Sequence, residues 1–182
     1  FPLETDTPEI LKTIKDDRLL ELAYFAPQWV PLIKAYLNWE GFDLAYYYFI
    51  AHTKEMGEDE KKAATALFTD LDPSDLADGA FDEKLFHEAY TAVGEKRFDL
   101  FYKAARYIGN SNYHSRARRF ADTALGKIDE ETIIEQIHSK RNKDAVCSLG
   151  LLPDKSDKAL QSRYQLIQAF LKESKQYGAQ RQ

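Results

Sequence analysis

The sequence has little of several features on which secreted and membrane proteins depend. It contains one cysteine, Cys147, so no disulfide can form within the chain, and a reducing compartment is favoured. No apolar run approaches the roughly 20 residues that a membrane-spanning helix needs. Residues 1–7 also lack the basic-then-apolar pattern of a signal peptide. We therefore expect a soluble protein of the cytoplasm with no membrane partner.

Motifs of common catalytic and cofactor sites are missing as well. There is no GxSxG, no GxGxxG and no GxxxxGK[ST] in the chain. No two of the four histidines are spaced i, i+4, and His87-Glu88 only begins an HExxH pattern, because Thr91 stands where the second histidine would be. Residues 70–75 have the acids of a calcium loop but lack its glycine and its terminal glutamate. We expect no cofactor, no metal and no catalytic residue in this chain.

The remaining candidates for site chemistry have simpler interpretations. His52 follows an apolar stretch, so we expect a hydrogen-bonded core or helix-cap residue. His114 and His138 lie beside arginines and lysines and are expected at the surface. Cys147 lies between apolar positions, which predicts a buried and inert thiol rather than a reactive one.

Hydrophobic residues are plentiful, at 44% of the chain with 13% aromatic, which is enough to build a core. Nearly every one of the eight glycines closes a stretch of helical period, and Thr7-Pro8, Asp72-Pro73 and Asp129 are helix-start signals. Between these marks the sequence predicts helices at about 8–15, 17–25, 28–38, 42–56, 58–69, 82–93, 95–108, 112–125, 130–140, 142–149 and 157–177, with a single turn at 73–77.

The fold class that follows is all-α. No segment alternates apolar and polar residues between turn signals, so no strand is expected. Connections are short, which favours antiparallel helix pairs in a bundle or in a short, irregular, HEAT-like α-solenoid. Residues 44–51 are apolar all round and predict a central helix, while Leu160, Tyr164, Ile167 and Leu171, widened by Phe170, form a stripe expected to face a core or a neighbouring helix.

The length suits one domain over residues 1–182, or two lobes at 1–78 and 79–182. The chain opens with Phe1 rather than Met and ends at Gln182 directly after a strongly patterned helix. We therefore expect a segment of a larger protein, whose other domains would be its first partners.

Charge is unevenly spread along the chain. Residues 96–143 carry 11 basic and 6 acidic side chains, whereas residues 54–95 carry 4 basic and 12 acidic ones. Within the basic part, arginines alternate with aromatic residues, as phosphate contact and base stacking would use them. The candidate polyanion-binding residues are Arg106, His114, Arg116, Arg118, Arg119, Lys140, Arg141 and Lys143.

The simpler interpretation of this basic cluster is structural. Arg118 and Arg119 point to different sides of one helix, and Arg106, Tyr107 and Phe120 fall partly on apolar stripes. Such arginines would tie helices together by pairing with acids such as Asp122 or with carbonyls at helix C-termini.

A set of segments gives the chain a pattern that is more specific than its composition. They are residues 79–82 with Phe86, 98–108, 114–117, 120–122, 125–127, 140–144, 149–153, 163–164 and 170–181. The set resembles the helical region of large uncharacterised bacterial proteins that often carry a WGR domain and sometimes bear a molybdate-metabolism-regulator-like label, and the resemblance spans about residues 28–182.

This resemblance implies a helical, HEAT-like segment that continues past Arg181, with no assigned activity and no catalytic residue to transfer. No WGR tripeptide occurs here, so a nucleic-acid role of that domain does not carry over.

Three functions stay open from the sequence. The first is a non-catalytic helical scaffold that contacts the rest of its own chain or a protein partner. The second is a nucleic-acid-associated regulatory module that uses the basic face of residues 96–143. The third is an incomplete part of an enzyme, for which Tyr102, His114 and residues 140–144 would be the first suspects.

Overall fold

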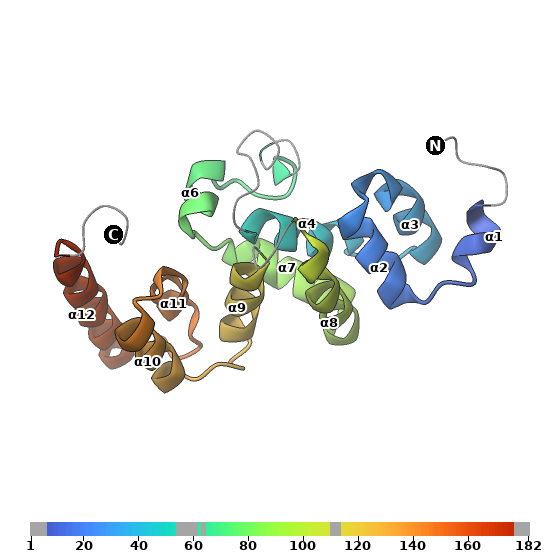
Figure 1. Ribbon diagram of the computed structural model, residues 1–182. Helices are drawn as coiled ribbons and strands as arrows, with labels where there is room; N and C mark the ends of the chain where they lie inside the picture. The colour runs from blue at the N-terminus through green and yellow to red at the C-terminus, as the bar shows by residue number, and fades with distance from the viewer. Residues whose placement is uncertain (1–6, 54–61, 63–64, 110–113, 177–182) are drawn as a thin grey trace. The chain divides into compact units, whose positions relative to one another are not determined.

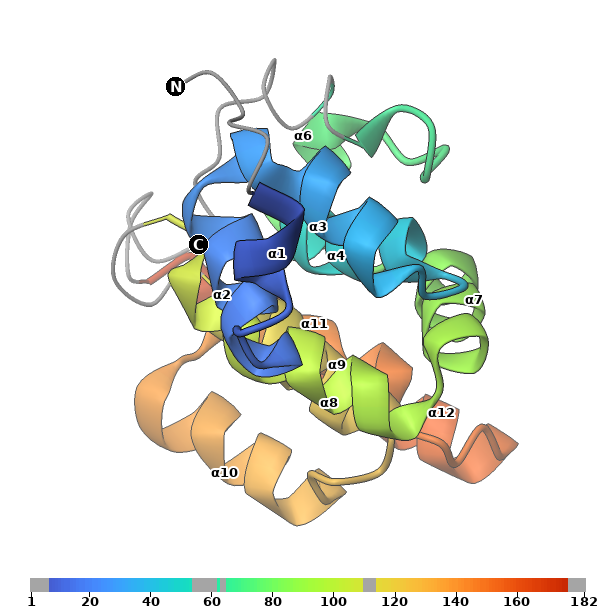
Figure 2. The ribbon, with the colours of Figure 1, turned by 90° about the vertical axis from the view of Figure 1, so that its right-hand side faces the viewer.

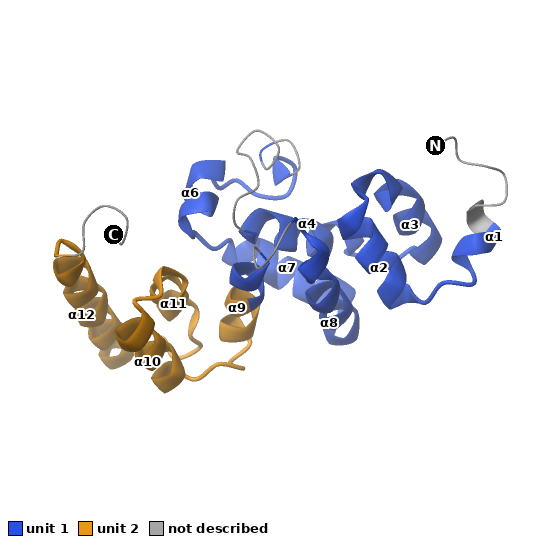
Figure 3. Ribbon diagram, viewed as in Figure 1, with its two compact units in different colours: residues 1–118 blue, residues 119–182 orange. Residues whose placement is uncertain are grey.

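The computed structural model describes residues 7–53, 62, 65–109 and 114–176. The chain is 75% helical, with 11 α-helices and no strand within these residues, which confirms the predicted all-α fold (Figure 1). It divides into two compact units, residues 1–118 and residues 119–182 (Figure 3), which are described separately. The prediction of one domain, or of lobes at 1–78 and 79–182, stays a prediction.

The helices lie close to their predicted positions, and the predicted helix at 58–69 falls largely outside the described residues. Among the described residues, no helix is both long and apolar enough to cross a membrane. The helices are α1 (Thr7–Leu11), α2 (Asp16–Phe25), α3 (Val30–Leu37), α4 (Phe42–His52), α6 (Pro73–Asp78), α7 (Glu83–Val93), α8 (Glu95–Ala104), α9 (Ser115–Ala124), α10 (Glu130–Lys140), α11 (Lys143–Ser148) and α12 (Asp157–Ser174), with 3₁₀ turns at Pro27–Trp29, Ala105–Tyr107 and Leu149–Leu151.

Short polar side chains fix several helix starts. The Asp72 carboxylate accepts a hydrogen bond from the Ser74 N–H at 2.8 Å, and the Asp129 carboxylate accepts one from the Thr132 N–H at 2.7 Å. Each bond satisfies a backbone donor that has no partner inside the helix. Two of the predicted start signals are thus confirmed, while the Thr7 and Pro8 side chains lie outside the described set.

The core of unit 1 is built around α4. Eight of its eleven residues are buried, so the prediction of a central helix is confirmed. Tyr48 and Phe49 lie against Phe86 of α7 and Phe98 of α8, with ring centroids 5.5 Å apart for Tyr48–Phe86 and 5.3 Å for Phe49–Phe98. Aromatic packing of this kind accounts for much of the apolar surface that unit 1 removes from water.

Unit 1 also joins helices that are distant in sequence. α4 packs most extensively against α7, and α2 against α8, as Figure 2 shows for the second pair. Tyr24 of α2 stacks on Tyr46 of α4 at 4.7 Å, and each hydroxyl donates to a backbone carbonyl of the other helix at 3.3 Å. Burial raises the pKa of both phenols, so both stay neutral donors. This packing is that of a bundle, because the layers of a repeat array contact only their neighbours.

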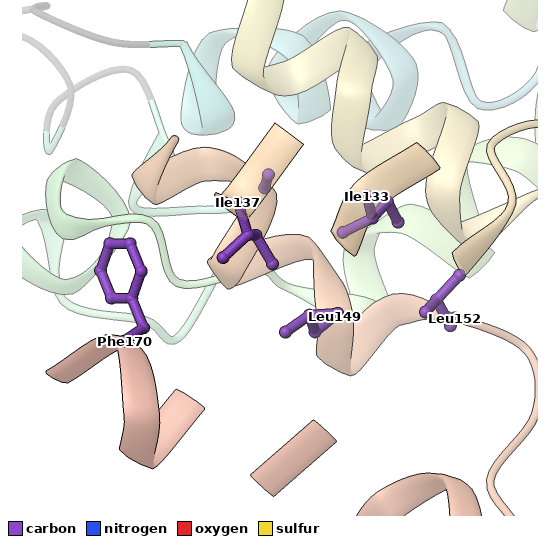
Figure 4. Close-up of a cluster of buried hydrophobic side chains, with 6 residues drawn as sticks. Ile133, Ile137, Leu149, Leu152 and Phe170 are labelled. Carbon is purple, nitrogen blue, oxygen red and sulfur yellow. The ribbon is translucent and has the colours of Figure 1, made fainter. Parts of the chain in front are cut away.

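Unit 2 has a separate, smaller core. α10 contributes Ile133 and Ile137, α11 and the turn after it contribute Ala145, Leu149 and Leu152, and α12 contributes Phe170. Figure 4 shows these side chains converging from the three elements. Ile128, Val146, Leu166 and Ile167 are partly buried around them. One side of α12 therefore belongs to a core.

Gly41, directly before α4, lies close against Ala92 of α7. Its φ of 72° is in the left-handed region, and a Cβ added there would lie 2.4 Å from the Ala92 Cβ. Glycine is therefore required at this position for two reasons, the backbone conformation and the lack of space.

We predict that Gly41→Ala lowers the free energy of unfolding by about 2–4 kcal/mol, the sum of a left-handed backbone penalty and of overpacking. Gly126→Ala is the matched control, because its φ is 69° at the end of a helix and the nearest atom to an added Cβ, the Pro153 Cγ at 3.6 Å, is at ordinary contact distance. It should cost only about 1 kcal/mol. Urea unfolding checks both variants, and equal losses would show that the approach to Ala92 imposes no constraint.

Candidate interaction surfaces

The apolar residues of α12 are only partly used by the core of unit 2. Phe170 is buried and Ile167 is half-buried, as the sequence predicts. Leu160, Tyr164 and Leu171, however, are 44%, 62% and 53% exposed. The prediction that the whole stripe faces a core or a neighbouring helix is wrong for these three residues among the parts of the chain that the structure describes.

The geometry of the helix explains the difference. On a helix of 3.6 residues per turn, Arg163, Phe170 and Ser174 share one side, and all three are buried. Leu160, Tyr164 and Leu171 share a side about 90° away. We call these three residues the outer face of α12. The apolar arc of α12 is thus wider than the core that covers it.

Arg163 occupies the core-facing side because its charge is fully partnered. Its guanidinium donates to both carboxylate oxygens of Glu130, at 3.0 and 2.9 Å, and to the Asp154 carbonyl at 2.6 Å. The side chain is 4% exposed. A two-pronged ion pair of this geometry offsets the cost of burying the guanidinium. Sequence reasoning missed this pair, and the only signal was an arginine spaced seven residues from a core phenylalanine.

Two of the candidate polyanion-binding arginines are internal. Arg116 is 3% exposed and donates to the carbonyls of His52, Thr53, Leu76 and Ala77, at 3.2, 3.4, 2.8 and 2.7 Å. These carbonyls lie at the C-terminal ends of α4 and α6, where helices leave acceptors without intrahelical partners. The Arg116 guanidinium therefore caps helix ends inside unit 1 and is not part of an exposed basic face.

Arg141 has a similar role inside unit 2. It donates to the Glu173 carboxylate at 3.2 Å and to the Ser174 hydroxyl at 2.6 Å. Its guanidinium also lies 4.5 Å from the centre of the Phe170 ring. Arg141 thereby connects the end of α10 to the end of α12, and its side chain is only 16% exposed. Of the other candidates in unit 2, Arg119 is half-buried, and Lys140 and Lys143 are exposed.

Three other candidates lie in unit 1. The Arg118 guanidinium stacks on the Tyr102 ring at 4.1 Å. Arg106 is exposed, pairs with the Glu21 carboxylate at 2.9 Å and stacks on Tyr107 at 4.8 Å. His114 is half-buried, and its pKa is lowered by burial and by the positive charges of Arg118 and Arg106. The eight candidate residues therefore fall into three groups. Arg116 and Arg141 form internal hydrogen bonds, whereas the other six lie in unit 1 (Arg106, His114, Arg118) or in unit 2 (Arg119, Lys140, Lys143).

The enzyme hypothesis would require a cleft with converging reactive groups. A hollow of about 170 Å³ in unit 1 lies beside Thr69, Asp82 and Glu88, and a wider one lies beside His87 and Glu88. In the first, the Thr69 hydroxyl donates to Asp82 at 2.5 Å, so these polar groups satisfy each other. Neither hollow is lined by Tyr102 or His114. Within the described part of the chain, no group of three or more metal-ligating side chains gathers.

Cys147 and His52 are two further residues whose side-chain types can take part in site chemistry. Cys147 is half-buried rather than buried. His52 is fully buried: its Nδ1 donates to the Tyr48 carbonyl at 2.8 Å, and its Nε2 accepts from the Asp82 N–H at 2.9 Å. The prediction of a hydrogen-bonded core histidine is confirmed.

Comparison with known families gives one result for the whole chain. A family of unknown function, DUF5724, matches residues 1–182. The chain belongs to this family. Comparisons with curated proteins and with solved structures gave no significant match.

Membership of DUF5724 assigns no activity and no site residues. The function must therefore be argued from the surfaces of the chain itself. Two of these surfaces stand out, namely the outer face of α12 in unit 2 and the hollows beside Glu88 in unit 1.

The Arg163–Glu130 pair gives a prediction for acid stability. The guanidinium of Arg163 lowers the pKa of Glu130 below its ordinary value of 4.5. A depressed folded pKa contributes stability that is present above pH 4.5 and is lost as the pH falls through the folded value. Between pH 5 and pH 3, unmodified protein should therefore lose more unfolding free energy than Glu130→Gln.

Glu135→Gln is the matched control, because Glu135 is exposed on the same helix. Between pH 5 and pH 3, it should lose as much unfolding free energy as the unmodified protein. The capping acids Asp129 and Asp154, whose pKa values are also lowered, are present in all three proteins, so they contribute equally to each loss. Urea unfolding at each pH measures the effect. Parallel losses in all three proteins would refute a role for the pair.

Proposed function

We propose that this chain is a non-catalytic helical interaction scaffold, and that the outer face of α12 docks a further helix of the same polypeptide. The observation that carries the proposal is the exposure of Leu160, Tyr164 and Leu171 side by side on one helix. Monomeric proteins seldom leave large apolar side chains adjacent in this way unless the surface binds a partner.

The spacing of the outer face indicates the shape of its occupant. Leu160, Tyr164, Ile167 and Leu171 are four, three and four residues apart, which is the a/d pattern of a seam between two paired helices. The side of α12 beyond the outer face is polar, with the exposed Gln161, Gln168 and Lys175. An amphipathic helix with a similar seam and with acidic residues opposite Lys175 would fit this surface.

The area of the outer face argues for a tethered occupant. With 44%, 62% and 53% of three large side chains exposed, the face offers roughly 300 Å² of apolar surface, taking 150–250 Å² for each whole side chain. A stable interface between separate molecules buries about 800 Å² on each partner. A helix in the same polypeptide needs less area, because its tether gives a high effective concentration.

The proposal extends to the resemblance found in the sequence. We assign the chain to the helical region of WGR-associated bacterial proteins in the cytoplasm, with the molybdate-regulator label adding no activity. Docking of a next helix on α12 would continue α10, α11 and α12 as a HEAT-like stack. The other domains of the longer polypeptide are then the first partners of this chain.

Substitution of the outer face tests this proposal. In the 182-residue chain, the triple variant Leu160→Gln, Tyr164→Gln, Leu171→Gln should change the free energy of unfolding by no more than about 0.5 kcal/mol, because these side chains are already in water. Phe170→Ala is the matched control on the same helix. It removes a core ring, so it should cost about 3 kcal/mol or more.

Hydrogen exchange then compares the 182-residue chain with a longer polypeptide that carries the proposed additional helix. Amides of α12 should be more protected in the longer polypeptide, and the triple variant should remove that difference. Equal protection in the two would overturn the proposal. A concentration-dependent dimer of the 182-residue chain, seen by sedimentation and lost in the triple variant, would replace the tethered helix by a second copy.

A further inference from the structure

Two hollows adjoin beside α7 in unit 1, where this helix packs against α4 (Figure 1). The wider one, of about 600 Å³, lies beside Glu40 and Ala92, and the smaller one, of about 170 Å³, lies beside Leu67. Leu44 of α4 and Glu88 of α7 line both hollows, so the two meet at these residues. We call the two hollows together the α4–α7 groove.

Leu67 is a large apolar side chain that lines this groove and is 91% exposed. The residues that follow it are held in place. The Phe68 ring stacks on the Tyr47 ring of α4 at 4.2 Å, and the Thr69 hydroxyl donates to the Asp82 carboxylate at 2.5 Å. Leu67 is thus presented to solvent by an anchored segment. A partner that covers it loses little free energy in ordering this segment.

The groove has an apolar floor and an acidic rim. Leu44 and Ala92, from the two helices, are half-buried in it. Glu40, Glu88 and Asp70 are exposed along it, and no ion pair formed among the described residues includes them. Apolar side chains are therefore flanked by carboxylates whose charge is not used within unit 1.

Cations are few around the groove. Among its described lining residues, Lys84 is the one lysine or arginine. The His87 ring lies 3.7 Å from the Glu83 carboxylate, which offsets its charge whenever the ring is protonated. Most of the lining belongs to residues 54–95, which carry 12 acidic and 4 basic side chains. The local potential is therefore negative and attracts a positively charged partner.

We propose that the α4–α7 groove binds a basic amphipathic helix of a partner protein. Apolar side chains of that helix cover Leu44 and Leu67, and its lysines or arginines face Glu40, Glu88 and Asp70. Binding of this kind uses apolar anchors one turn apart, while charges at the rim accelerate the encounter and set the orientation. The groove lies in unit 1, so this proposal is independent of the outer face of α12 in unit 2.

Other ligands suit the groove less well. A nucleic acid is repelled by its three unpaired carboxylates. A small molecule would need polar groups to orient it. The half-buried polar groups of the groove, the Thr69 hydroxyl and the Asp82 carboxylate, are already bonded to each other. The surface that is left is apolar with acidic edges, which fits a basic helix.

Two synthetic helices of about four turns test the proposal, one of leucine and lysine and one of leucine and glutamate in the same order. In NMR titrations of the 182-residue chain at low ionic strength, the lysine peptide should shift the amides of Leu44, Leu67 and Glu88. The glutamate peptide should not, because its carboxylates meet the acidic rim. The amides of α12 are the internal control. Its outer face is apolar but lies beside the exposed Lys175, so it should not respond to the lysine peptide.

Calorimetry then gives the Kd of the lysine peptide for single variants. Glu88→Lys should raise the Kd about tenfold at low ionic strength, because an attraction becomes a repulsion. Glu135→Lys is the matched control, an exposed glutamate in the middle of α10, and should leave the Kd within about twofold. Leu67→Gln should raise the Kd about tenfold through lost apolar burial, whereas Leu171→Gln should not change it. All four side chains are exposed, so the variants should keep the fold, which the rest of each NMR spectrum verifies.

Any of three results contradicts the proposal. One is equal affinity for the lysine and glutamate peptides, since the groove would then have no selectivity for charge. Another is an equal loss of affinity in Glu88→Lys and Glu135→Lys, since net charge alone would then attract the peptide. The third is a response to the lysine peptide in the amides of α12 instead of those of the groove.

Discussion

The arrangement of unit 1 depends on one buried guanidinium. Arg116 reaches from α9 to the ends of α4 and α6, and it donates to carbonyls at both of these helix ends. Helix C-termini carry partial negative charge, so the same contacts compensate the buried positive charge. The Tyr48 hydroxyl, which donates to the Ala117 carbonyl at 3.1 Å, binds α4 to α9 a second time. Three helices are thus fixed by polar bonds inside an aromatic core.

Unit 2 uses the same device twice. Arg163 joins the start of α10 to α12 through Glu130, and Arg141 joins the end of α10 to α12 through Glu173 and Ser174. Both guanidinium groups are largely buried, with the side chains of Arg163 and Arg141 4% and 16% exposed. Most of the apolar surplus of α12 is thereby left on its outer face. The apolar surface that unit 2 leaves exposed on α12 therefore depends on how its own arginines are paired.

The sequence predicts the helices but not all of the tertiary contacts that they make. Asp72-Pro73 is a local signal and the apolar run of α4 is central wherever it packs, so these two predictions are confirmed. The first helix end before α4 is formed by Asn38 and not by Gly41, which lies directly before α4. The acceptors of Arg116 lie 39 or more residues away, and Glu130, the ion-pair partner of Arg163, lies 33 residues away, so no local pattern encodes them. For the same reason, the sequence does not show which part of the α12 stripe the core of unit 2 covers.

Both ring nitrogens of His52 are used in hydrogen bonds, and this limits the reactivity of the side chain. A carbonyl can only accept and a backbone amide can only donate, so the imidazole is held as the neutral form with its hydrogen on Nδ1. Neither nitrogen has a lone pair or a hydrogen left to exchange with water or to offer to an ion. This ring acts as a rigid crosspiece between α4 and the start of α7.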